Sequence, residues 1–286
     1  MPELRPGSSR DRSPRLGQKM PLTSVCILFA IIAVCVLANF IAPCDASNMD
    51  ASAIDAAPDS THIFGTDTLG RDLFSMILYG GRYSLLIGCL AAAISACIAV
   101  VYGCVSGLAP RPVDECMMRF IEILLSIPSI LLIIFLQAVW GSPTVLSISV
   151  VIGVTSWMNI AKIVRSEVRQ IRNADYVLAA RIMGGGFFYV LRRHLLPNFI
   201  SSIMYMVVSN VGAAIASEAT LSFLGLGLPL TVVSWGSLLS MSQEVLLTGS
   251  WWIILLPGLF LVVTIVCITD IGDYIRRKNN RLFSNL

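Results

Sequence analysis

The chain has 286 residues, of which 56% are hydrophobic and only 13% are charged, and its formal net charge is +3. Soluble domains carry about 25% charged residues, so a folded chain of this size with so little charge requires lipid as the solvent for much of its surface. The composition therefore excludes a soluble enzyme, a nucleic-acid-binding protein and a disordered chain.

Five uncharged stretches are long enough to cross a bilayer, which needs about 20 apolar residues in a helix. They are Leu22–Ala42, Tyr83–Pro110, Ile123–Ala161, His194–Ser217 and Val245–Thr269. The third is too long for one crossing and contains the turn signal Trp140-Gly141-Ser142-Pro143, which predicts two helices joined by a tight hairpin. The sequence therefore predicts an all-α membrane protein with six transmembrane helices.

Lys and Arg residues orient these helices. Eighteen of the 20 fall on one side of the predicted membrane, and only Arg71 and Arg82 fall on the other. Basic residues are retained on the cytoplasmic face during insertion, so the N- and C-termini are predicted to be cytoplasmic. The first apolar run is too long for a secretory signal and no clear cleavage site follows it, so it is predicted to be a retained helix.

A further uncharged stretch, Ala219–Gln243, has the length of a crossing but contains three glycines and Pro229. A seventh crossing there would place the basic C-terminal tail outside. We therefore expect a broken or re-entrant segment, which is tolerated at membrane depth only where protein covers it or where it lines a wet cavity.

The predicted helices divide the chain into five parts. They are a cytoplasmic tail at 1–21, the first transmembrane helix at 22–42, an extracytoplasmic loop with an interfacial helix at 43–82, a core of five transmembrane helices at 83–270, and a cytoplasmic tail at 271–286. The core includes a long cytoplasmic loop at 162–197.

The outer loop ends in a sequence that predicts a short helix. Asp67 is the candidate N-cap, and Gly80-Gly81 would end the helix. Its apolar face would be formed by Leu69, Leu73, Met76 and Ile77. Such a helix would lie along the outer membrane interface. We expect this loop to be a structural strap before the second crossing rather than a contact site for an external partner.

The inner loop, Lys162–Leu196, carries seven of the 20 basic residues and an amphipathic helix of its own. Its apolar residues at helical spacing are Tyr176, Ala179, Ala180, Met183 and Phe187. Three glycines at 184–186 then end this helix, and Pro197 suits the first turn of the next crossing. Binding to anionic lipid explains the arginines but not the small residues, so docking to a partner protein is the favoured interpretation.

The sequence lacks the motifs of covalent chemistry. It contains no phosphate-binding loop, no nucleophile elbow and no zinc-protease motif, and His62 and His194 fall on opposite sides of the membrane. The eight cysteines form no C-x-x-C pair and are expected to be apolar fillers without a metal. The sequence also lacks the line of intramembrane carboxylates that is expected in an ion-driven pump. These features predict a non-catalytic pore whose energy comes from another subunit.

The inner loop resembles the EAA loop of ABC-importer permeases. The family pattern is Glu-Ala-Ala, three residues, Gly and, after a fixed interval, Leu-Pro; Ala179-Ala180, Gly184 and Pro197 fall where it requires. Leu178 replaces the glutamate, which weakens any argument for a salt link from that position.

Four further segments resemble the second permease subunit of dipeptide, oligopeptide and nickel importers. They are Phe64–Asp72, Gly81–Leu85, Ser222–Gly227 and Ser234–Gly236. The residues singled out in or beside them are Gly65, Asp67, Gly70, Arg71, Asp72, Glu218, Ser222, Gly225, Gly227, Trp235 and Gly236. The C-terminal tail departs from the family's usual ending and keeps only part of it.

The resemblance implies a type I ABC importer permease fold in the bacterial cytoplasmic membrane. Such a permease works with a second homologous permease, two cytoplasmic ATP-binding subunits and an extracytoplasmic substrate-binding protein. ATP and Mg²⁺ bind the ATPase subunits, and the permease itself holds no cofactor. The residues implied in ATPase coupling are Asp175, Tyr176, Ala179, Ala180, Arg181, Gly184, His194 and Pro197.

The implied function is ATP-driven import of peptides or nickel by alternating access. Peptides are ranked ahead of nickel or a metal chelate because Ala216–Ala219 and Ser234–Gly236 are closer to peptide members. The path would run between the second to fifth crossings and the re-entrant segment. Glu218 would either meet a cationic group of the cargo or hold that segment, and the second role is favoured. A self-sufficient secondary transporter or channel, or a membrane scaffold, is the alternative of another class.

Overall fold

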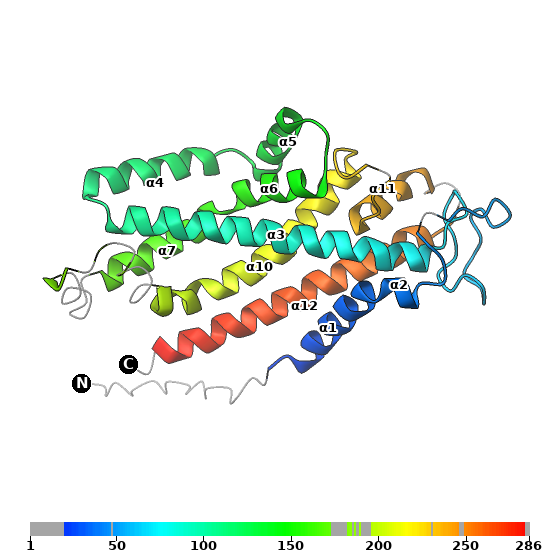
Figure 1. Cartoon of the computed structure of the whole chain (residues 1–286), viewed down its shortest axis with the longest axis horizontal. Coiled ribbons are helices and arrows are strands. Elements are labelled where there is room, and N and C mark those ends of the chain that lie inside the picture. Colours follow the sequence, from blue (N-terminus) through cyan, green and yellow to red (C-terminus); the bar gives the residue numbers. More distant parts are fainter. Residues whose placement is uncertain are drawn as a thin grey trace, which may run out of the picture.

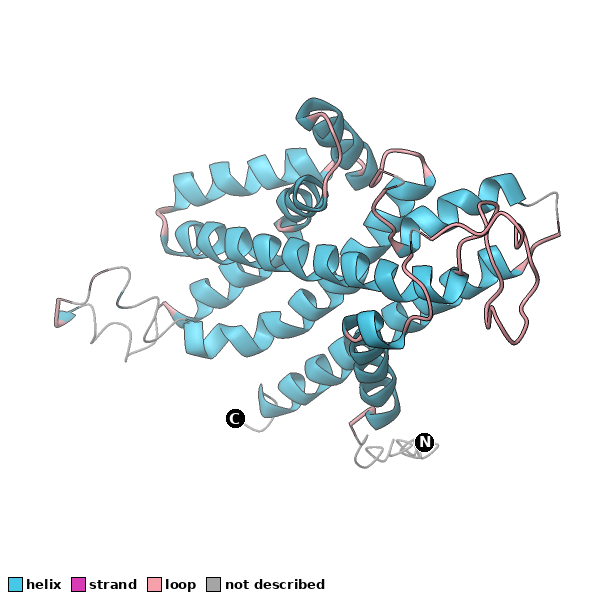
Figure 2. Cartoon of the chain, turned by 45° about the vertical axis from the view of Figure 1, so that its right-hand side comes forward, coloured by secondary structure: helices cyan, strands magenta, loops and turns pink. Residues whose placement is uncertain are grey.

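The computed structural model describes residues 20–46, 48–172, 182–184, 186, 189, 196–229, 231–245 and 249–283. In these residues the chain is helical and forms no strand beyond an isolated bridge between Thr66 and Asp72. The helices are α1 (Leu22–Val36), α2 (Ala38–Ile41), α3 (Leu73–Leu108), α4 (Arg111–Leu125), α5 (Ser129–Trp140), α6 (Val145–Ser156), α7 (Met158–Ile171), α10 (Leu196–Phe223), α11 (Trp235–Val245) and α12 (Trp252–Phe283). Figure 1 shows an elongated bundle, and Figure 2 shows the non-helical loop before α3 gathered at one end of it.

Three segments are long and apolar enough to cross a membrane: α3, Ile203–Phe223 of α10 and Trp252–Lys278 of α12. Two bent helix pairs, α4 with α5 and α6 with α7, qualify as broken spans, which gives up to five candidate spans in the described chain. Helix α1 is apolar but shorter, with 15 residues. These six elements correspond to the six predicted crossings, and the fold is all-α as predicted.

Both bends have local causes. Helices α4 and α5 meet at 89° where Pro128 precedes α5, because proline disfavours helical backbone in the residue before it. Helices α6 and α7 meet at 46°. There the hydroxyls of Thr155 and Ser156 donate to carbonyls one turn earlier, at 3.0 Å and 2.6 Å, an arrangement that bends helices.

The two predicted interruptions are present. The hairpin between the third and fourth crossings forms at Gly141, whose φ of +96° suits glycine. Thr144 then caps α6 by accepting a hydrogen bond from the backbone N–H of Ser147. The predicted re-entrant stretch is also broken, because α10 ends at Phe223 and α11 begins only at Trp235.

Helix α3 is the central element, packed along α6, α7 and α10 (Figure 1). Glycines allow this close approach: a Cβ on Gly103 or Gly107 would lie 2.7 Å from the side chain of Val164 or Val168 in α7. Small residues at helix contacts are typical of membrane bundles, in which packing rather than water exclusion holds helices together.

The start of α3 corrects one prediction. The helix begins at Leu73, and Asp72 is its N-cap, accepting a 2.8 Å hydrogen bond from the backbone N–H of Ser75. It continues without a break through Gly80 and Gly81, so the separate interfacial helix from Asp67 to these glycines is wrong. The glycines do not end a helix; they let α3 touch the segment before α11. In the first turn of α3, Leu73, Ser75 and Met76 are buried in protein.

The loop before α3 is fastened to the bundle. The buried carboxylate of Asp67 accepts hydrogen bonds from the backbone N–H groups of Leu69 and Arg71 and forms a 2.7 Å ion pair with the Arg71 guanidinium. The indole N–H of Trp252 in α12 donates to the carbonyl of Thr66 at 3.2 Å. These contacts support the interpretation of the loop as a structural strap.

Candidate functional site

The bundle has two distinct ends. At the inner end α3 connects to α4, α7 ends and α10 begins; at the outer end lie the strap and α11 (Figure 1). Ser24 near the start of α1 donates a 2.8 Å hydrogen bond to Asp270 in α12, so the first helix begins beside the last. The start of α1 and the second half of α12 therefore lie side by side, as a fold with both termini on one side of the membrane requires; that this side is the cytoplasmic one stays a prediction.

A charged cluster holds the inner end together. Asp114, in the first turn of α4, is only 1% exposed. Its carboxylate accepts hydrogen bonds from the Arg165 guanidinium at 2.5 Å, from Arg169 at 2.8 Å and from the Ser106 hydroxyl at 2.6 Å. Two oxygens bonded by one guanidinium give a strong, oriented contact. The cluster therefore locks α3, α4 and α7 into one unit.

Sequence reasoning missed the role of Asp114. It treated Arg165 and Arg169 only as cytoplasmic charges that orient the protein. The spacing of these two arginines, one turn apart in a helix, and an acidic residue in the first turn of another helix are the signals available in the sequence. Neither signal identifies the partner, because the pairing joins residues 51 and 55 positions apart.

The predicted coupling helix follows α7 directly. Most of its predicted residues, Asp175, Tyr176, Ala179, Ala180, Arg181 and His194, lie outside the described residues. Gly184 is described: it is exposed, its φ is +87°, and, its chain neighbours apart, no atom of the described residues lies within 4 Å of the position of a Cβ. Ile182 and Met183 are 86% and 82% exposed. Pro197 is the second residue of α10, as expected for the start of the next crossing.

A second buried carboxylate organises the outer end. Glu218 in α10 is fully buried. Its carboxylate accepts hydrogen bonds from the hydroxyls of Ser234 at 2.7 Å, Ser222 at 2.9 Å and Ser84 at 3.2 Å. These serines belong to α3, to α10 and to the segment that leads into α11. Glu218 therefore holds the re-entrant segment, the role favoured from the sequence.

The re-entrant segment folds back tightly over Glu218. Gly225, with a φ of +76°, turns the chain just after α10 ends at Phe223. A Cβ on Gly236 would lie 2.6 Å from Cα of Ala219. Trp235 is fully buried, and its indole N–H donates to the carbonyl of Ile77 in α3 at 3.0 Å. The family-motif residues of this region thus serve to close a polar turn inside the bundle.

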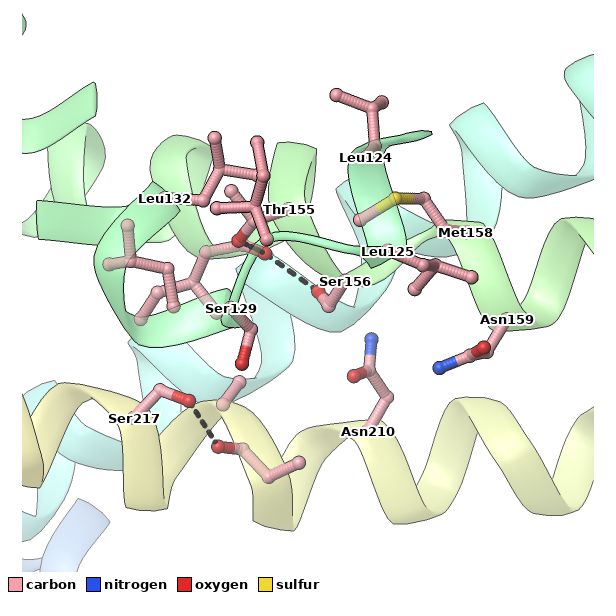
Figure 3. Close-up of a pocket in the computed structure, with 15 residues that line it drawn as sticks. Leu124, Leu125, Ser129, Leu132, Thr155, Ser156, Met158, Asn159, Asn210 and Ser217 are labelled. Atoms are coloured by element: carbon pink, nitrogen blue, oxygen red, sulfur yellow. Dashed lines mark hydrogen bonds between the residues drawn. The ribbon is translucent and has the colours of Figure 1, made fainter. Parts of the chain in front are cut away.

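A cavity of about 230 Å³ lies between the two ends, lined by the last residues of α4 and by α5, α6, α7 and α10. Figure 3 shows the amide of Asn210 pointing from α10 into it and the amide of Asn159 pointing from α7 toward Asn210. Ala213 and Ala214 of α10 also border it. The two asparagines were missed because single uncharged polar residues in an apolar run leave no periodic signal.

The Glu218 contacts predict a stability effect. Glu218→Ala removes the acceptor of three buried hydroxyls and should lower the free energy of unfolding by about 3 kcal/mol, because buried polar groups without partners are costly. Glu218→Gln keeps one acceptor oxygen and should lose less. Thermal unfolding of the purified protein in detergent, followed by tryptophan fluorescence, measures both. Glu115→Ala, which removes an exposed carboxylate, is the control, and equal melting of Glu218→Ala and this control would contradict the assignment.

The chain is similar to membrane components of transport systems. Residues 71–281 match the family model described as "Binding-protein-dependent transport system inner membrane component". The dipeptide transport system permease protein DppC of Bacillus subtilis (strain 168) is 41% identical over 216 residues, which cover 76% of this chain and 67% of that protein. The oligopeptide transport system permease protein OppC of the same organism is 35% identical over 258 residues, covering 90% of this chain and 84% of that protein.

A solved structure agrees with the fold. A crystal structure of an amino acid ABC transporter with histidines superposes with a TM-score of 0.53 at 15% identity, covering 72% of this chain and 94% of the matched chain. At this identity the likeness concerns the fold alone. The family match covers most of the chain and includes Asp114 and Glu218. The chain therefore belongs to the family of inner membrane components of binding-protein-dependent transport systems and has the type I importer permease fold.

Proposed function

We propose that the chain is the permease subunit of an ATP-driven importer that moves di- or oligopeptides across the bacterial cytoplasmic membrane. The observation that carries this proposal is the similarity to permeases named for dipeptide and oligopeptide transport, at 41% and 35% identity. The second of these matches extends over 90% of the chain, so it covers the strap, the inner loop and the re-entrant segment together.

The proposed assembly contains a second homologous permease, two cytoplasmic ATP-binding subunits and an extracytoplasmic binding protein that delivers the peptide. ATP hydrolysis belongs to the ATP-binding subunits, and this chain is not an enzyme. The exposed Ile182 and Met183 support the role of the inner loop as a docking surface, because apolar side chains of this size on a cytoplasmic loop gain from contact with a partner.

Energy enters through the inner loop between α7 and α10. The Asp114 cluster ties α7 to α3 and α4, so a displacement of the loop moves these three helices together. ATP-driven closure of the ATPase pair draws the coupling helices toward each other and switches the access of the cavity from one side to the other. Coupling requires that ATP and the loaded binding protein each bind more tightly to one of the two access states of the importer than to the other.

Reconstitution tests the function. Proteoliposomes that contain the complete importer should take up labelled di- and tripeptides only under two conditions. ATP must be present on the side of the membrane that carries the ATP-binding subunits, and the binding protein must be present on the opposite side. The purified single chain should transport nothing. Peptide transport by the single chain without ATP would instead identify a self-sufficient transporter or channel, and uptake of Ni²⁺ without peptide uptake would overturn the peptide assignment.

A substitution at Gly184 tests the docking surface. Gly184→Glu adds bulk and a negative charge at an exposed position with positive φ, and it should abolish co-purification of the ATP-binding subunits while membrane insertion is unchanged. Gly141→Glu is the matched control, because Gly141 also has positive φ and no neighbouring atom within 4 Å but lies in the hairpin between α5 and α6. Normal co-purification of the Gly184→Glu protein would refute the docking assignment.

A substitution at Arg165 tests the transmission of motion. Arg165→Ala leaves Asp114 with Arg169 and Ser106, so the complex should assemble. The number of peptides imported per ATP hydrolysed should fall about 5-fold, which corresponds to a loss of about 1 kcal/mol in coupling free energy. Arg119→Ala, which breaks an exposed ion pair on α4, is the control. An unchanged ratio of transport to hydrolysis in Arg165→Ala would show that the cluster only stabilises the fold.

A further inference from the structure

The cavity between the bent pair α6–α7 and α10 has an uncharged lining. None of its fifteen lining side chains is ionisable, and six of them are polar. The polar lining residues are Ser129, Thr155, Ser156, Asn159, Asn210 and Ser217. They come from α5, α6, α7 and α10 (Figure 3), so neutral hydrogen-bonding groups face the cavity from several sides.

Three of the four hydroxyls in this lining donate their protons within their own helices. Those of Thr155, Ser156 and Ser217 each donate to a carbonyl of their own helix, at 2.6 to 3.0 Å. Each therefore offers only acceptor lone pairs to the cavity. In contrast, the side-chain nitrogen of Asn210 is buried and donates to no group in the described part of the chain. A buried donor without an acceptor is costly, so a ligand that brings a carbonyl oxygen relieves it.

A peptide bond supplies what this lining lacks. It carries one strong acceptor and one donor, and the amide of an asparagine side chain can bond to both. The apolar lining residues, among them Leu132, Ile133 and Met158, leave room for side chains of varied shape without selecting a charge. An uncharged lining also avoids holding cargo too tightly for release, as passage requires.

We propose that this cavity is the peptide-binding section of the translocation path and that Asn159 and Asn210 hydrogen-bond the main chain of the cargo. The proposal rests on the peptide-import function stated above. Asn210 lies eight residues before Glu218, about 12 Å along the helix, and so between the coupling end and the re-entrant segment. Asn159 and Asn210 stand on α7 and α10, the two helices that flank the inner loop. Movement of that loop changes their separation and releases the peptide.

Uptake by proteoliposomes containing the complete importer tests the assignment. The probes are Ala-Ala-Ala, Ala-Glu-Ala and Ala-Lys-Ala, and each rate is divided by the wild-type rate, which cancels the preference of the binding protein. Asn210→Leu should slow all three peptides by the same factor, about 3- to 10-fold, the effect of one lost hydrogen bond. ATP hydrolysis stimulated by the loaded binding protein should persist. Asn159→Leu should act likewise. Asn159 is exposed, so this substitution should leave the fold intact.

Thr220→Val is the matched control, since it also replaces a polar by an apolar group on α10 but lies outside the cavity lining; it should transport normally. Wild-type rates for all three peptides in both asparagine variants would overturn the inference, as would a loss confined to one peptide, because that indicates a side-chain contact. If Asn210→Leu fails to assemble, Asn159→Leu decides alone. Absence of peptide uptake by the wild-type importer would refute the proposed function itself.

Discussion

In a lipid solvent, every polar group at membrane depth must find its partner inside the protein. Two buried carboxylates show two solutions to this constraint. Asp114 at the inner end is neutralised by the guanidinium groups of Arg165 and Arg169. Glu218 at the outer end accepts bonds only from serine hydroxyls among the described contacts. Removal of Glu218 would leave three buried hydroxyls without this acceptor, and removal of Asp114 would leave the buried Ser106 hydroxyl and two partly exposed guanidinium groups without theirs. The arrangement of the helices around each end therefore depends on its carboxylate.

Helix α3 joins the two ends, because it provides Ser106 to the Asp114 cluster and Ser84 to Glu218. It therefore belongs to both rigid units, one built with α4 and α7 and the other with α10 and the segment before α11. The cavity lies where α7 and α10 face each other at a distance from both clusters. The bundle is held at both ends by buried carboxylates, whereas at its middle the buried side-chain nitrogen of Asn210 has no acceptor among the described residues. Its freedom to change therefore lies in that middle.

Hydropathy and turn chemistry predicted the crossings, the hairpin at Gly141 and the break before Trp235, since apolar length and glycine positions are local properties. The start of α3 was not predictable in this way. Asp67 and Asp72 both precede apolar residues and both suit an N-cap, and the choice is made by the ion pair of Asp67 with Arg71. Gly81 resembles a helix end, but its lack of a side chain serves contact with Trp235 in a distant segment.

The uncharged cavity also fits the division of tasks in a multi-subunit importer. A carboxylate in a lining of low dielectric would hold a peptide amino terminus strongly, and each turnover would then have to overcome that attraction. Hydrogen bonds from amides and hydroxyls replace hydrogen bonds to water, so their net contribution to the binding free energy is much smaller. A cargo therefore passes without being trapped. In the proposed importer, selection among peptides would belong to the protein that delivers them, whereas Asn159 and Asn210 would respond only to the main chain that all peptides share.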